Sequence, residues 1–185
     1  MKAGVLALQG DVREHVAMFV ECGATPVLIR TPDDLAEVSC LAIPGGESTT
    51  IGKLARLHGL VEPIQRRVQE GMPVLGTCAG MIVMASEVGG GDPLLDVMDM
   101  AVERNAYGRQ VDSFEADVDV KGVGPVRAVF IRAPQVTRVG PAVDVLAEHD
   151  GRPVVVQQER LVASAFHPEM AGDPRLHRRL LELSG

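Results

Sequence analysis

The hydrophobic positions in the first half of the chain form short continuous runs that alternate with stretches of helical spacing. A short apolar run bounded by glycine, proline or polar residues is typical of a strand buried on both faces. Four runs fit this description, at residues 3–8, 26–29, 41–43 and 72–75. Helices are predicted after them, over residues 11–22, 48–57 and 61–70, and from the turn at 76–80 through 85. Strands that alternate with helices imply a parallel sheet covered on both faces.

The first predicted helix has a sequence signal at each end. Asp11, with Glu14 three residues later, matches the pattern of a capping box. Val16 and Phe19 then fall at helical spacing, and Gly23 is suited to end the helix. These residues place the helix directly after the first strand.

The second half of the chain shows a different pattern, in which short strand-like segments follow one another with turns between them. Six segments have this character, at residues 98–103, 114–120, 126–131, 143–148, 154–158 and 162–165. They predict an antiparallel or mixed extension of the sheet. Asp173 and Pro174 then mark the start of a last helix. Leu176, Leu180 and Leu183 give that helix an apolar stripe.

Length and composition fit one soluble domain of the α/β class. The chain has 185 residues, of which 46% are hydrophobic and 23% charged. No repeat or linker divides it, so we expect a single domain over residues 1–185 with a mostly parallel central sheet and an antiparallel extension.

Charge and cysteine usage exclude several classes of protein. The formal net charge of −7 disfavours binding to nucleic acid, which depends on basic surfaces. No apolar run approaches the length of a membrane span, and we expect neither a signal peptide nor a membrane partner. The three cysteines are widely spaced and form no C-x-x-C pair, so a disulfide framework or a zinc site is not expected. A cytoplasmic protein without a bound metal is the simplest prediction.

The most specific chemical feature is a G-x-C-x-G turn between a predicted strand and a predicted helix. This pattern is the cysteine version of a nucleophile elbow, with Cys78 between Gly76 and Gly80. The two glycines remove side chains that would collide with neighbouring backbone. The helix N-terminus favours a thiolate, and the N–H of Ala79 is placed to donate to an oxyanion. A cysteine chosen at random is more often a small core residue, which is how we interpret Cys22 and Cys40.

A nucleophilic cysteine needs a base, and His167 is the best candidate of the five histidines. It follows the last predicted strand and precedes Pro168, which biases His167 toward extended backbone. Residues i and i+2 of an extended chain face the same way, so Glu169 can orient the imidazole and stabilise its protonated form. Taken alone, His-Pro-Glu is equally consistent with a histidine at a strand end beside a solvated glutamate. His15 and His177 fall in amphipathic helices, where we expect them to be exposed.

A second glycine turn follows the strand at 41–43 and opens the next helix, for which Ser48 is the expected N-cap. Free backbone N–H groups at Gly45 and Gly46 could bind phosphate or supply an oxyanion donor. A P-loop is excluded because five residues separate Gly46 from Gly52 and Leu54 replaces the required hydroxyl residue. No G-x-G-x-x-G pattern follows the first strand, so a dinucleotide site is unsupported.

Together these motifs resemble a known family. The G-T-C-A-G elbow, the P-G-G-E-S-T turn and the late H-P-E match class I (triad) glutamine amidotransferases. The L-Q-G segment at 8–10, the R-N-x-x-G-R-Q-V-D-S-F-E segment at 104–115 and F-I-R-A-P at 130–134 are similar to the glutaminase subunits of pyridoxal phosphate synthases. The segment at 104–115 is the most discriminating, because a generic amidotransferase elbow does not predict it.

The resemblance implies a fold, a reaction and a set of site residues. The fold would be the flavodoxin-like, three-layer fold of class I amidotransferases. Cys78 would be the nucleophile, completed as a triad by His167 and Glu169, and the reaction would release ammonia from L-glutamine through a thioester. The oxyanion hole would involve Gly45, Gly46 and Ala79. The residues implied to bind glutamine are Gly46, Glu47, Ser48, Arg104, Ile131 and Arg132; composition alone would make the two arginines ordinary surface residues.

The same resemblance implies a partner. Ammonia would pass to a (β/α)₈-barrel synthase subunit that makes pyridoxal 5′-phosphate, in a synthase dodecamer decorated by glutaminase subunits. Such a glutaminase would be poorly active until docked. The glutaminase half-reaction needs no metal or organic cofactor.

Three alternatives remain at this stage. The chain could be the glutaminase of another ammonia-using synthase, although the segment at 104–115 argues against it. It could be a stand-alone cysteine hydrolase of flavodoxin-like fold, which would act without a partner. It could also be a flavodoxin-like binding module with an unreactive, buried Cys78.

Overall fold

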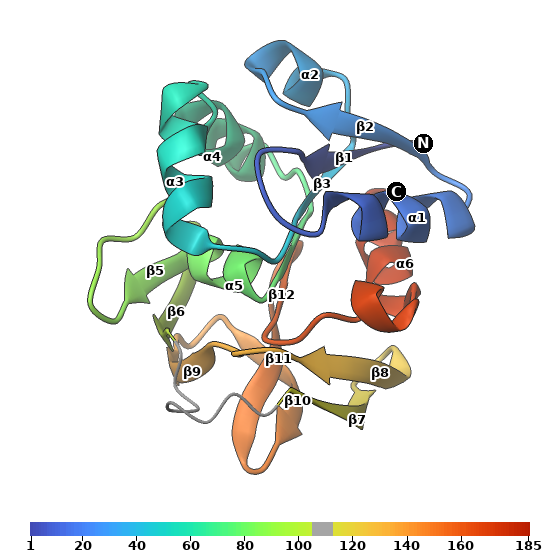
Figure 1. The fold of residues 1–185 in the computed structure, drawn as a ribbon, viewed down its shortest axis with the longest axis vertical. Helices are drawn as coiled ribbons and strands as arrows, with labels where there is room; N and C mark the ends of the chain where they lie inside the picture. The colour runs from blue at the N-terminus through green and yellow to red at the C-terminus, as the bar shows by residue number, and fades with distance from the viewer. Residues whose placement is uncertain (105–112) are drawn as a thin grey trace.

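A seven-stranded sheet forms the centre of the molecule in the computed structural model, which describes residues 1–104 and 113–185 (Figure 1). Its strands lie in the order β10 (Asp144–His149), β11 (Arg152–Gln158), β12 (Leu161–Ser164), β4 (Val74–Thr77), β3 (Cys40–Ile43), β1 (Lys2–Leu6) and β2 (Thr25–Ile29). The five strands from β12 to β2 are parallel, whereas β10 and β11 pair antiparallel. The predicted mostly parallel sheet with an antiparallel extension is confirmed.

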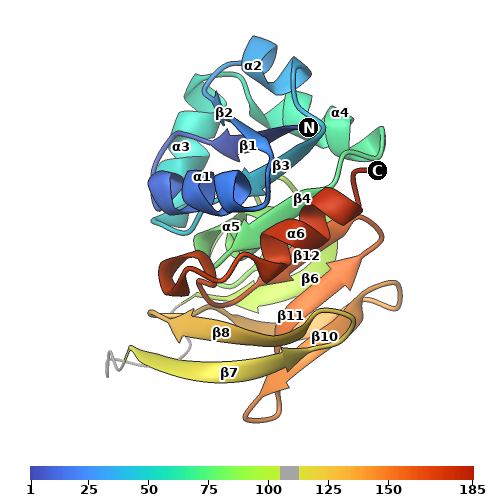
Figure 2. The same ribbon diagram turned by 90° about the vertical axis from the view of Figure 1, so that its right-hand side faces the viewer.

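Helices cover both faces of this sheet and make three layers. On one face lie α1 (Val12–Glu21) and α6 (Arg175–Glu182), and on the other lie α3 (Ser48–Leu57), α4 (Val61–Gln69) and α5 (Ala79–Met84) (Figures 1 and 2). A short helix, α2 (Pro32–Ala36), follows β2. Every residue of β3, β4 and β12 is buried between the layers, which explains their continuous apolar sequence. No helix within the described ranges is long and apolar enough to cross a membrane.

The remaining strands form two small sheets beside the central one. One contains β5 (Ala85–Val88), β6 (Met98–Glu103) and β9 (Gln135–Val139), and the other is the hairpin of β7 (Phe114–Val120) and β8 (Gly124–Phe130). The prediction that the segments at 98–103, 114–120 and 126–131 extend the central sheet was therefore wrong. These strands alternate between buried and more exposed positions, as strands covered on one face do.

The parallel arrangement determines where chemistry can occur. Parallel strands end at the same edge of a sheet, so the segments that follow β1, β3, β4 and β12 meet there. These segments carry the L-Q-G, P-G-G-E-S, G-T-C-A-G and H-P-E motifs, respectively.

Candidate active site

The turn after β4 holds Cys78 in a conformation that few L-residues adopt. Its backbone angles are φ 49° and ψ −104°, and its N–H donates to the carbonyl of Ser164 on β12 at 2.8 Å. A Cβ at Gly80 would collide with the carbonyl of Ile43, and a Cβ at Gly76 would collide with the backbone of Gly80. The flanking glycines are thus required by close packing, as the sequence predicted. The strained turn presents Cys78 at the edge of the sheet.

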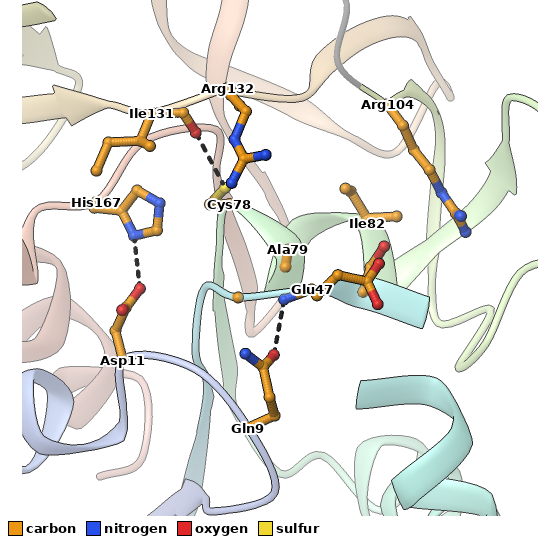
Figure 3. A pocket seen from close by; sticks show the side chains of 12 residues that line it. Gln9, Asp11, Glu47, Cys78, Ala79, Ile82, Arg104, Ile131, Arg132 and His167 are labelled. Carbon is orange, nitrogen blue, oxygen red and sulfur yellow. Dashed lines mark hydrogen bonds and ion pairs between the residues drawn. The ribbon is translucent and has the colours of Figure 1, made fainter. Parts of the chain in front are cut away.

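Cys78 opens into a cavity of about 420 Å³ at this edge (Figure 3). The cavity is lined by Gln9, Asp11, Gly46, Glu47, Ser48, Cys78, Ala79, Ile82, Arg104, Ile131, Arg132 and His167. All the residues proposed from sequence line it except Gly45 and Glu169. The structure therefore brings together residues from the ends of six strands, β1, β3, β4, β6, β8 and β12.

His167 lies beside Cys78 because its backbone is fixed to the β7–β8 hairpin. Its N–H donates to the carbonyl of Val129 at 2.9 Å. Its ring Nδ1 lies 2.9 Å from Oε1 of Glu169, which is 3% exposed. A charged carboxylate only accepts hydrogen bonds, so Nδ1 carries the proton of this contact. Cys78, His167 and Glu169 thus have the arrangement of nucleophile, base and orienting acid.

The surroundings of His167 favour its protonated form. Burial lowers the pKa of His167, but hydrogen bonds with Asp11, Cys78 and Glu169 outweigh burial and raise the pKa to about 12. Burial likewise acts to raise the pKa of Glu169, but interactions with His15 and His167 hold that pKa well below its usual range. Glu169 is therefore a buried anion beside a cationic imidazole.

Asp11 is a site residue that the sequence analysis missed. It stands at the N-cap of α1, yet its side chain makes no capping hydrogen bond, so the predicted capping box with Glu14 was wrong. Its Oδ2 lies 3.2 Å from Nδ1 of His167 instead (Figure 3). The available signal was position: Asp11 follows the first parallel strand, at the edge where ligands bind.

The two loops that border Cys78 pack backbone against backbone. Gly10 has φ 103°, and a Cβ there would collide with the carbonyl of Gly45. That carbonyl also accepts the N–H of Asp11 at 3.1 Å. On the same turn, the N–H of Glu47 donates to Oε1 of Gln9 at 2.7 Å. The Gly45–Gly46 turn is thereby held next to the elbow.

The N–H of Ala79, the third expected oxyanion donor, begins α5. The first N–H groups of a helix have no partner within the helix, so this group is available to a bound oxyanion.

Glu47, rather than the expected Ser48, is the N-cap of α3. Its carboxylate accepts the N–H of Thr49 at 3.0 Å and that of Thr50 at 2.7 Å. The Thr50 side-chain hydrogen bond is the largest cause that lowers the pKa of Glu47 to about 2. Glu47 is thus a fixed anion on the cavity wall.

Two arginines and a backbone carbonyl complete the cavity. Nη1 of Arg104 lies 3.4 Å from Oγ1 of Thr49, while its buried Nε has no partner among the described residues. Arg132 has φ 45°, and the carbonyl of the preceding Ile131 lies 3.9 Å from Sγ of Cys78 (Figure 3). Residues 105–112, which carry most of the discriminating R-N-x-x-G-R-Q-V-D-S-F-E motif, lie outside the described residues.

One group of side chains within the described ranges has the geometry to hold a metal ion. Asp11, His167 and Glu169 each place one ligand atom within 4.8 Å of the others. The shared atom is Nδ1 of His167, which both carboxylates approach within hydrogen-bonding distance. Hydrogen bonds to one imidazole N–H account for this cluster.

Comparison with known proteins decides the family. The sequence profile of the SNO glutamine amidotransferase family matches residues 5–183. This chain belongs to that family. The resemblance drawn from the elbow, the P-G-G-E-S-T turn and H-P-E is confirmed.

Curated relatives and solved structures agree with this assignment. A protein of Pelotomaculum thermopropionicum named pyridoxal 5′-phosphate synthase subunit PdxT is 55% identical, over 98% of this chain and 94% of the relative. A PdxT of Thermus thermophilus is 54% identical, over 98% and 97%. A crystal structure described as a glutamine amidotransferase superposes with a TM-score of 0.95 at 50% identity, covering 99% and 98% of the two chains. PurLQS from Thermotoga maritima, at 15% identity and a TM-score of 0.74, shares the fold.

Proposed function

We propose that this chain hydrolyses L-glutamine to L-glutamate and ammonia, and that it delivers the ammonia to a synthase subunit that makes pyridoxal 5′-phosphate. The observation that carries the proposal is the strained Cys78 at the mouth of a cavity, with His167 and the buried Glu169 beside it. The relatives named pyridoxal 5′-phosphate synthase subunit, at 54–55% identity over nearly the whole chain, support the pathway.

In the first half-reaction, the sulfur of Cys78 attacks the side-chain amide carbon of glutamine. The amide carbonyl becomes an oxyanion, which accepts hydrogen bonds from the N–H of Ala79 and from the Gly45–Gly46 turn. His167 then gives its proton to the departing nitrogen, the C–N bond breaks, and ammonia leaves. A glutamyl thioester remains on Cys78.

In the second half-reaction, water replaces ammonia. His167, now neutral, takes a proton from the water as it attacks the thioester carbon. The same donors stabilise the second oxyanion, the C–S bond breaks, and glutamate is released. Glu169 keeps the imidazole in the tautomer with the proton on Nδ1 throughout. No metal or organic cofactor takes part in either step.

The cavity walls suit an amino acid that carries both charges. The fixed anion of Glu47 and the guanidinium groups of Arg104 and Arg132 offer partners for the α-ammonium and α-carboxylate of glutamine. Gly46, Ser48 and Ile131 line the remaining wall. Residues 1–185 act as one glutaminase domain, and the free thiols of all three cysteines suit a reducing cytoplasm.

The partner is a (β/α)₈-barrel synthase subunit, in the dodecameric assembly that the family resemblance implies. Docking would activate the glutaminase and keep ammonia from escaping into water. The turn at Gly45 and Gly46 is the natural point of activation, because it borders both the oxyanion site and the surface.

Ammonia release from glutamine, measured for the purified chain alone and with a pyridoxal phosphate synthase subunit, tests the proposal. We expect the synthase to stimulate the rate strongly. We expect Cys78→Ala to abolish the stimulated activity, whereas Cys22→Ala, a control at a cysteine outside the cavity, leaves it intact.

Each negative result has a separate meaning. Equal rates with and without the synthase would refute the partner and leave a stand-alone hydrolase. Activity retained in Cys78→Ala would refute the nucleophile. No glutamine hydrolysis by the wild-type complex would refute the function itself.

A further inference from the structure

A cluster of buried polar side chains lies behind the candidate triad, on the side away from the cavity. His15 on α1, Thr77 at the end of β4 and His177 on α6 are fully buried, and they adjoin Glu169. The expectation that both histidines are exposed was wrong, because α1 and α6 lie side by side on one face of the sheet (Figures 1 and 2).

These side chains form one continuous chain of hydrogen bonds that ends on Glu169. Nε2 of His177 lies 2.8 Å from Nδ1 of His15, and Nε2 of His15 lies 3.1 Å from Oγ1 of Thr77. Thr77 donates to Oε1 of Glu169 at 3.2 Å, and Nε2 of His15 lies 3.5 Å from the same oxygen. Oε1 also receives Nδ1–H of His167, whereas Oε2 has no partner among the described residues.

The chemistry of the end groups fixes the direction of the hydrogen bonds. The ionised Glu169 only accepts, so Thr77 must donate to it, and the hydroxyl of Thr77 is then free to accept Nε2–H of His15. His177 is neutral, because burial lowers its pKa to about 3. If its single proton is on Nε2, it donates to Nδ1 of His15 and leaves only an acceptor, Nδ1, without a partner. Every donor in the chain then points toward Glu169.

From this geometry we infer that His15 and Thr77 are positioning residues: they orient the Glu169 carboxylate so that Oε1 faces His167. The inference rests on the proposed glutaminase function. Among the described residues, the hydrogen bonds to the carboxylate of Glu169 are all made to Oε1, so they define its rotation about the last side-chain bond. Without His15 and Thr77, a single hydrogen bond from His167 would have to hold a buried charge in place.

A purely structural role explains these residues less well. Apolar side chains would fill the interface between α1, α6 and β4 without the desolvation that buried polar groups suffer. Phe19, one turn along α1 from His15, makes such an apolar contact, with its ring centroid 5.2 Å from that of His177. The hydrogen-bonded polar side chains instead run without a break from His177 through His15 and Thr77 to Glu169.

The test compares variants at His15 in the complex with the synthase subunit. His15→Leu removes the hydrogen bonds to Thr77 and His177 and also the 3.5 Å contact of Nε2 with the charged Glu169. An interaction with a charged group contributes about 1.5–3 kcal/mol, so we expect kcat for glutamine to fall about tenfold to a hundredfold. KM should stay unchanged, because His15 does not line the cavity. His15→Gln, whose amide can donate from near the position of Nε2, should restore part of kcat.

The pH profile supplies a readout that packing alone does not move. The groups that face His167 are Asp11, Cys78 and Glu169, with His15 and His177 behind Glu169. Since Glu169 helps to raise the pKa of His167, a misplaced carboxylate should move the alkaline limb of kcat to lower pH in His15→Leu.

Two further variants make the result decisive. Phe19→Leu loosens the same interface without removing a hydrogen bond, so it should leave kcat and the pH profile unchanged. Thr77→Val keeps the shape of Thr77 and removes only its hydroxyl, so it supplies the test if His15→Leu does not fold, and it should lower kcat in the same way. If both His15→Leu and Thr77→Val behave like Phe19→Leu while the wild-type complex is active, the inference is overturned. An inactive wild-type complex would instead refute the proposed function.

Discussion

At the scale of single residues, the unusual feature of the site is that Nδ1 of His167 faces two carboxylates. Glu169 is buried and lies 2.9 Å away, whereas the side chain of Asp11 is 31% exposed and lies 3.2 Å away. A single N–H serves both, with Glu169 the shorter contact. The buried acid is suited to orientation, and the exposed one adds negative charge at the cavity wall.

Replacement of Asp11 by asparagine should shift the pH dependence of catalysis. Asp11 raises the pKa of His167, so Asp11→Asn should lower that pKa and move the alkaline limb of kcat to lower pH. The limb falls at high pH because neutral His167 has no proton for the leaving ammonia. The shift should be about one pH unit, since the hydrogen bond is charge-assisted. Helix α1 should persist, because Asp11 makes no side-chain cap. The measurement is the pH–rate profile of the complex.

Glu14→Gln is the matched control for this experiment. Glu14 stands on the same helix, and its ion pair is with Arg13 rather than with His167. Glu14→Gln removes one negative charge near the start of α1, as Asp11→Asn does, but it leaves the cavity unaltered. An identical alkaline limb in Asp11→Asn and wild type would show that Asp11 does not interact with His167 in solution.

At the scale of elements, the strand–turn–helix of β4 and α5 stores strain at its central residue. A side chain at φ 49° and ψ −104° is disfavoured by contact with its own backbone, and glycine adopts such angles freely. The strain at Cys78 therefore lowers the free energy of unfolding. Packing gives no reason for this strain, whereas the chemical role of Cys78 does.

Cys78→Gly should accordingly be more stable than Cys78→Ala, by about 1 kcal/mol, which is about 2–4 °C in Tm for a chain of this size. In ordinary helix or strand positions the order is reversed, and glycine is less stable than alanine by roughly 0.5–1 kcal/mol. Thermal unfolding of the two inactive variants is the measurement. A more stable alanine variant would mean that the turn relaxes to negative φ and that the strain is absent.

Sequence patterns predicted the elements of this site better than the contacts between them. The apolar runs of β3 and β4 and the glycines around Cys78 reflect local backbone requirements, which a sequence displays directly. The sequence around Asp11 is equally suited to a helix cap. The contact of Asp11 with His167 depends on a loop 156 residues away along the chain (167 − 11). Local propensity could not distinguish an Asp11 that caps the helix from an Asp11 that contacts His167.

At the scale of the whole molecule, the wrong predictions for the smaller sheets and for the two buried histidines have a common cause, which is long-range packing. The strands β6, β7 and β8 were recognised, but their partners are set by how the layers assemble. His15 and His177 were expected in solvent because a helical pattern does not reveal what covers the next face. Two helices meeting over β4 instead bury two histidines, and this burial has a consequence for the stability of the entire fold.

The consequence is a loss of stability in mild acid, and it can be assigned to His177. Its folded pKa of about 3 lies below the value of about 6.5 for an unfolded histidine. Between these values the unfolded chain binds a proton that the folded chain does not, so the free energy of unfolding falls as the pH falls through this window.

In His177→Gln, whose amide cannot titrate, Tm should fall less between pH 6.5 and pH 4, by about 2–4 °C for each 1 kcal/mol removed. His58→Gln, at an exposed histidine on the C-cap of α3, should lose stability in parallel with wild type. Both variants retain Glu169, whose depressed pKa adds its own acid loss to every curve, so the difference between the curves isolates His177. If the curve of His177→Gln paralleled the wild-type curve instead, burial of a neutral His177 would not be a cause of the loss of stability in mild acid.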